Sequence, residues 1–182
     1  MKNILFILLS FGLFQITNAQ KFISKTGHIM FYSYTPIEEI EAHNRQVVSI
    51  LDVATGDLQF NLLVKSFEFK IALMQEHFNE NYMESDQYPK SSFKGKITDT
   101  DMIDFKKDGV YPASVSGDLM IHGITKTITT TGTLEIKGGS ITANAKFTVS
   151  PKDYNIEIPS LVENKIAKSI DIHVDVTYTL PQ

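Results

Sequence analysis

The most constraining feature of the sequence is an apolar residue at every second position over long stretches. Between residues 166 and 180 the even positions are apolar with the single exception of Lys168, and most odd positions are polar. Successive side chains of a β-strand point to opposite faces, so this period of two predicts strands with one buried and one exposed face. The same alternation recurs at 141–149, 58–62 and 93–97. The chain is therefore expected to consist mainly of strands.

Short turn signals separate the alternating stretches. Thr55-Gly56, Asp108-Gly109 and Gly138-Gly139 fit tight connections, and strands joined in this way must be antiparallel. Many short strands with one apolar face indicate a closed barrel or a sandwich. The pattern places about eight strands, at 29–35, 40–53, 57–69, 91–99, 102–105 with 110–122, 124–137, 140–150 and 165–180.

One stretch breaks the period of two. Its apolar residues recur at the spacing of an amphipathic helix: Ile71, Met74, Phe78 and Tyr82. This helix should end before Tyr88-Pro89, because a proline disfavours the α conformation in the residue that precedes it. The sequence therefore predicts one helix inserted between strands, with its apolar face on the sheet.

His77 lies beside this apolar stripe and raises the question of a metal or catalytic site. The other four histidines are scattered without the spacing of metal ligands, so we predict no metal site and interpret His77 as the polar flank of a packed helix. The chain has no cysteine, which excludes thiol catalysis and thiolate ligands. No motif of a nucleophilic serine, a zinc protease or a phosphate-binding loop occurs. We therefore predict neither catalytic residues nor a cofactor.

The first residues have the composition of a secretory signal peptide. Lys2 precedes an apolar run from Ile4 to Phe14, and Ala19 ends a small-residue cleavage site, so residues 1–19 should be removed before Gln20. Residues 20–182 suit one domain. The net charge of −4 argues against nucleic-acid binding. We expect a periplasmic or secreted protein without stable membrane insertion; its oligomeric state is open.

Three longer stretches resemble a known family. They are HFNENYMESDQYPKSSFKGKI at 77–97, SGDLMIHGITKTITTTGTLEI at 116–136 and FTVSPKDYNIEIP at 147–159. In this order and spacing they resemble the YceI-like family, lipocalin-like proteins that bacteria export and that bind polyisoprenoid chains. The resemblance implies an all-β fold, an eight-stranded antiparallel lipocalin-like barrel with one inserted amphipathic helix.

The resemblance also implies a function. The protein would hold an apolar-chain lipid, namely a polyisoprenoid, an isoprenoid quinone or a fatty acid, inside the barrel and without catalysis. An eight-stranded barrel has room for one slender ligand. The candidate ligand-binding residues are Phe31, Phe60, Met74, Phe78, Tyr82, Phe93, Ile121, Gly132, Ala143, Ala145, Phe147 and Ile172.

The turn at Gly138-Gly139 predicts a register for the strands on either side. It pairs Ile136 with Ile141, Leu134 with Ala143, Gly132 with Ala145, Thr130 with Phe147 and Ile128 with Val149, all on the inward face. The residues Gly132, Ala143 and Ala145, here called the glycine–alanine strip, have almost no side chain. We predict that a lipid chain lies along this strip; the alternative is that the Phe147 ring fills the space.

Two other functions are open. An enzyme on the barrel scaffold would use His77, Glu80 or Asp153 as acid or base, since a fold does not determine a function. An outer-membrane barrel also fits alternation with a period of two. The lack of tryptophan and of aromatic girdles, together with the inserted helix, counts against a membrane barrel.

Overall fold

The computed structural model describes residues 21–180, so the expected signal peptide and its cleavage position lie outside the described residues. The helical and strand elements are β1 (Lys21–Tyr34), β2 (Glu39–Asp52), β3 (Asp57–Leu63), η1 (Val64–Ser66), β4 (Glu68–Phe69), α1 (Ala72–His77), η2 (Phe78–Tyr82), β5 (Lys90–Ile97), η3 (Thr100–Met102), β6 (Gly109–Ile121), β7 (Ile124–Lys137), β8 (Ser140–Val149), η4 (Pro151–Tyr154), η5 (Ser160–Lys165) and β9 (Ile170–Tyr178).

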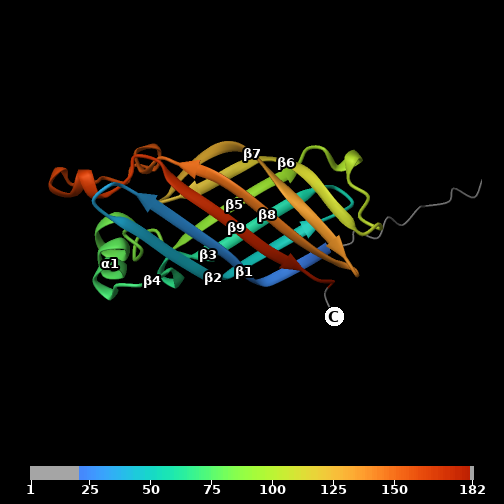
Figure 1. The fold of residues 1–182 in the computed structure, drawn as a ribbon, viewed down its shortest axis with the longest axis horizontal. Coiled ribbons are helices and arrows are strands. Elements are labelled where there is room, and N and C mark those ends of the chain that lie inside the picture. The colour runs from blue at the N-terminus through green and yellow to red at the C-terminus, as the bar shows by residue number, and fades with distance from the viewer. Residues whose placement is uncertain (1–20, 181–182) are drawn as a thin grey trace, which may run out of the picture.

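The eight longer strands form one closed antiparallel ring. Their order is β1-β9-β8-β7-β6-β5-β3-β2, and pairing of β2 with β1 closes the ring. The two-residue strand β4 pairs with Ala42 and His43 near the start of β2. In Figure 1 the strands lie side by side along the long axis, with α1 at one end and the β5–β6 loop near the other. The predicted eight-stranded antiparallel barrel with one inserted helix is confirmed.

The boundaries of several strands differ from the prediction. β1 begins at Lys21 rather than near residue 29, because its register against β2 shifts on both sides of Gly27 and this bulge breaks the period of two. The predicted strand 57–69 is interrupted by the 3-10 turn η1. β9 begins at Ile170 rather than near 165, since the 3-10 turn η5 and a bend precede it.

The predicted strand segment 102–105 is wrong. The chain forms the 3-10 turn η3 there and then a loop, from which Ile103 is buried in the barrel core and Phe105 packs against that core. The apolar alternation of these residues therefore reflects loop packing. A strand and a loop that buries every second side chain give the same pattern.

The inserted helix has two parts. α1 continues directly into η2, a π-helical turn in which the backbone N–H of Met83 donates to the carbonyl of Phe78 at 2.8 Å. The helical stretch ends well before Tyr88-Pro89, as predicted. A π-helical turn is less stable than an α-helical one and is often found at functional sites.

The register of β7 against β8 follows the prediction only in part. The pairs from Lys137–Ser140 to Gly132–Ala145 are those that the turn predicts. Backbone pairing then stops, so the predicted pairs of Thr130 with Phe147 and of Ile128 with Val149 are wrong. At this point the Thr130 hydroxyl, rather than a backbone N–H, faces the Lys146 carbonyl at 3.5 Å. β8 continues to pair with β9 as far as Val149, and β7 with β6 as far as Ile124, so the two strands separate from each other while each keeps its other neighbour.

Candidate ligand-binding site

One end of the barrel is filled with side chains. Leu51, Ile97, Ile141 and Tyr178 are fully buried there in the larger of two core clusters. The Tyr178 hydroxyl lies 2.7 Å from the Ser49 Oγ, so its polar group is paired although buried. Burial raises the pKa of Tyr178, and the phenol stays protonated at neutral pH. We call this the closed end of the barrel.

Away from the closed end the interior is hollow. On β7 the inward side chains of Ile136 and Leu134 are 3% and 4% exposed. Further along the same face Gly132, Thr130 and Ile128 are only partly buried. Inward positions of a closed barrel are exposed only where the interior leaves space. The cavity therefore begins near Leu134, which also lines it.

This cavity has a volume of about 580 Å³, within the range of sites that bind small molecules. The inner faces of the strands form its wall, and α1, η2, η4 and η5 contribute residues at the open end. All twelve candidate residues line it: Phe31 (β1), Phe60 (β3), Met74 (α1), Phe78 and Tyr82 (η2), Phe93 (β5), Ile121 (β6), Gly132 (β7), Ala143, Ala145 and Phe147 (β8), and Ile172 (β9).

The glycine–alanine strip lies on this wall. A Cβ placed on Gly132 would have its three nearest heavy atoms on Asn144 and Ala145, the closest being the Asn144 carbonyl oxygen at 2.3 Å. Glycine is thus required by the close approach of the β8 backbone, and no atom of Phe147 is among the three. Phe147 itself is partly exposed and lines the cavity. All three residues of the strip line the cavity, as Phe147 does.

A second pair of glycines shows the opposite arrangement. Gly95 on β5 pairs with Gly117 on β6, and the Cζ atom of Phe93 would lie 2.5 Å and 2.8 Å from a Cβ at these two positions. The Phe93 ring therefore covers both glycines. Phe60 meets this ring edge-on, with the centroids 6.3 Å apart. Both aromatic side chains also line the cavity, so on this side rings form the wall where the backbone carries glycine.

Aromatic packing attaches the helix to the barrel. The Phe78 ring of η2 has its centroid 5.3 Å from Phe31, 5.7 Å from Phe67 and 5.0 Å from Phe69. These four residues, here called the aromatic cluster, lie over the buried side chain of Ala42. Aromatic pairs at such distances stabilise packing beyond the area they bury. The Phe78 ring thus helps to hold the helix on the barrel and also faces the cavity.

Charged groups occur at the open end of the cavity. Glu38 and Lys165 are the charged residues of its lining, and their Oε2 and Nζ atoms are 3.7 Å apart. His77 also borders the cavity and is exposed to solvent. Among residues 21–180, no group of three or more His, Asp or Glu side chains is arranged to hold a metal ion.

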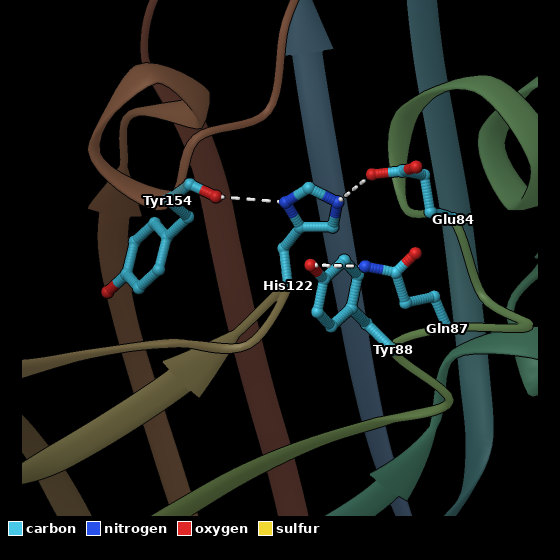
Figure 2. Close-up of polar contacts among 5 residues, drawn as sticks. All are labelled: Glu84, Gln87, Tyr88, His122 and Tyr154. Carbon is cyan, nitrogen blue, oxygen red and sulfur yellow. Dashed lines mark hydrogen bonds and ion pairs between the residues drawn. The ribbon is translucent and has the colours of Figure 1, made fainter.

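A buried histidine connects three loops beside the cavity. Figure 2 shows His122 between Tyr154 and Glu84. Its Nδ1–H donates to the Tyr154 carbonyl at 3.1 Å, and its Nε2 lies 2.9 Å from the Glu84 Oε2. Glu84 and His122 have φ angles of 42° and 50°, a left-handed conformation that non-glycine residues adopt only where their surroundings hold them. This contact fixes the loops next to Ile121 and Met83 of the cavity wall.

Sequence reasoning missed the residues at the open end. Glu38, Lys165 and Tyr154 carry no periodic signal, because they lie in turns. A signal did exist at Ile156 and Ile158, which alternate with Glu157 between the predicted strands 140–150 and 165–180. Both isoleucines line the cavity although the segment has no regular structure.

A closed antiparallel barrel with an apolar cavity defines the lipocalin-like class of barrels. More particularly, the chain belongs to the YceI-like domain family, whose model matches residues 14–178. No curated protein matches the sequence.

Solved structures share this fold at low sequence identity. A polyisoprenoid binding domain from Saccharophagus degradans is 14% identical with a TM-score of 0.75, over 90% of this chain and 99% of that chain. BcnA of Burkholderia cenocepacia is 17% identical with a TM-score of 0.70, over 83% and 95%. The YceI protein of Campylobacter jejuni is 14% identical with a TM-score of 0.54, over 100% and 99%.

Proposed function

We propose that the protein is an exported, non-enzymatic carrier of an apolar-chain lipid. The observation that carries this proposal is the cavity of about 580 Å³, formed where inward apolar side chains of the barrel remain partly exposed. Exposed apolar surface inside a fold is unfavourable unless a ligand covers it. The structural relative from Saccharophagus degradans is named as a polyisoprenoid binding domain, which supports the same class of ligand.

The distribution of polar groups orients such a ligand. The wall along β7 and β8 is apolar, whereas Glu38, Lys165 and His77 lie at the open end. An apolar chain would enter first, and a polar head would remain near these groups. A polyisoprenoid, an isoprenoid quinone or a fatty acid has this form. Burial of each CH₂ contributes about 0.8 kcal/mol, so the length of the cavity, rather than the energy of transfer, would limit the chain.

The alternatives fit the structure less well. For an enzyme, the acid and the base would have to lie close together. His77 and Glu80 are instead exposed to solvent on the inserted helix. Asp153 lies on η4, where its Oδ1 is 3.7 Å from the Nζ of Lys126. For an outer-membrane barrel, outward side chains would have to be apolar. On β7 they are Thr, Lys and Glu at the odd positions from 125 to 137. No helix within residues 21–180 combines the length and apolar character needed to cross a membrane.

The proposal is tested on protein purified after expression with its own leader. Mass spectrometry of organic extracts should find an apolar-chain lipid at about one per protein, and N-terminal sequencing should begin at Gln20. Delipidated protein should bind a dansyl-labelled fatty acid or geranylgeraniol. Extracts without lipid, together with no binding of either compound, would show that the cavity is not a lipid site.

A further inference from the structure

The open end of the barrel exposes large apolar side chains from three segments. They are Tyr34 and Ile37 around the β1–β2 turn, Ile71 and Leu73 at the start of α1, and Leu161 on η5, here called the apolar rim. Their exposure ranges from 50% to 88%. Figure 1 places the β1–β2 turn, α1 and η5 at the same end of the molecule. Half of the ten large apolar side chains that residues 21–180 leave exposed thus lie around one opening.

Residues of all three segments line the cavity, and contacts join two of the segments, so the rim lies around the opening. Ile71 and Leu73 line the cavity themselves. The 3.7 Å ion pair of Glu38 with Lys165 joins the β1–β2 turn to η5, and the backbone N–H of Ala167 donates to the Ser33 Oγ at 2.9 Å. At Ile71 and Leu73 the exposed apolar surface therefore adjoins the apolar wall inside.

The charges of the rim identify the kind of surface that it fits. Residues 34–39, 70–74 and 160–168 contain three acidic and three basic side chains, whereas the whole chain has a net charge of −4. The rim is thus neutral on an acidic protein. Neutral apolar tips that include a tyrosine, whose ring is amphipathic, suit the boundary between headgroups and acyl chains of a membrane.

We infer that the apolar rim docks the open end of the barrel onto a lipid surface. In this orientation the cavity faces the acyl chains, and a ligand passes between membrane and barrel without exposing its chain to water. A protein partner would require a contiguous patch, but the rim is made of separate tips around an opening. The inference rests on the proposed function for its purpose, while docking itself is measured without a ligand.

The experiment is flotation of delipidated protein with phosphatidylcholine vesicles. The rim variant is Ile37→Ser with Leu161→Ser, two residues that do not line the cavity. The matched control is Met102→Ser with Val110→Ser, which removes two exposed apolar side chains, 76% and 66% exposed against 59% and 88% in the rim variant, from the β5–β6 region at the other end. We expect the wild type and the control to float equally, and the rim variant to lose at least about tenfold in partition. Added salt should change the partition little.

Binding of a dansyl-labelled fatty acid in solution separates the two proposals. Unchanged binding by the rim variant supports a rim that acts only in docking. If the wild type binds the labelled fatty acid but does not float, the docking inference is wrong and the carrier function stands. If the wild type floats but does not bind the fatty acid, docking stands and the carrier function is wrong. Equal flotation of the rim variant would refute the inference. So would flotation on anionic vesicles alone, or a dimer that the rim variant dissociates.

Discussion

Two identical substitutions at different depths of the barrel test whether the space beside the glycine–alanine strip is empty. Ala145 faces the cavity and is partly exposed, whereas Ala42 is 0% exposed beneath the aromatic cluster and does not line the cavity. Replacing each by leucine adds the same group to both sites. The cavity interpretation predicts opposite effects on the free energy of unfolding.

The magnitudes follow from what the larger side chain meets. In Ala145→Leu the added carbons enter apolar space, which contributes about 2 kcal/mol of transfer free energy, while ordering the side chain costs about 0.5–1 kcal/mol. The delipidated variant should therefore be as stable as the wild type or up to about 1–2 kcal/mol more stable. In Ala42→Leu the same carbons press against Val47 and Phe67 of a filled cluster. Overpacking of this kind costs about 1–3 kcal/mol.

The measurements are urea unfolding of delipidated protein and titration with a dansyl-labelled fatty acid. Ala145→Leu should weaken binding by at least about tenfold, or 1.4 kcal/mol, because its side chain occupies the ligand's space. Thr148→Leu, on the outward face of the same strand, should leave binding unchanged. If Ala145→Leu loses as much stability as Ala42→Leu, the space is already filled and the cavity has been misplaced. Wild-type affinity would mean that the ligand avoids the strip.

Two further substitutions test the attachment of the helix and the pH dependence of folding. Phe78→Ala should lower the free energy of unfolding by about 2–3 kcal/mol, because the ring is only partly buried; removing a fully buried ring costs roughly 3–5 kcal/mol. The control is Leu73→Ala, at an exposed position of the inserted helix, which should change the free energy of unfolding by less than about 0.5 kcal/mol. An unchanged unfolding midpoint with lost lipid binding would make Phe78 a ligand contact rather than an anchor. Partial burial, and then the charges of Arg45 and His43, lower the pKa of His28 from its ordinary 6.5 despite Asp175. The unfolded chain then takes up the proton first, so stability falls as the pH drops below about 6.5 and levels off below the folded pKa. His28→Gln should flatten urea midpoints measured between pH 7.5 and 4.5; an unaltered slope would assign the effect to other groups.

The barrel was predictable because each of its strands separates an apolar inside from a polar outside at every residue. The prediction fails where a bulge or a loop interrupts this alternation of inward and outward side chains. The bulge at Gly27 shifts the phase of β1, and Ile103 is buried from a loop, so the same pattern is missed in one place and over-interpreted in another. Both errors concern boundaries, because a local irregularity does not alter which strands pair.

The wall of the cavity was predictable in part, for a different reason. The turn at Gly138-Gly139 fixes the register of β7 and β8, and the register places Gly132 beside Ala145. The sequence does not reveal that an aromatic ring lies against Gly95 and Gly117 whereas the β8 backbone lies against Gly132, because that depends on the direction of the Phe93 side chain and on how closely the strands approach. The ion pair of Glu38 with Lys165 was not predictable, since turns distant in the chain meet only in three dimensions.

The division of the barrel into a closed end and a hollow end also has an evolutionary consequence. Along β7, Ile136 contributes to the core and does not line the cavity, while Ile128 and Thr130 line it a few residues away. Selection for a new ligand can therefore change side chains at the hollow end without disturbing those that hold the fold. Relatives with little sequence in common can keep one architecture and bind different ligands. In protein design, the residues of the cavity wall can likewise be substituted while those of the closed end are kept.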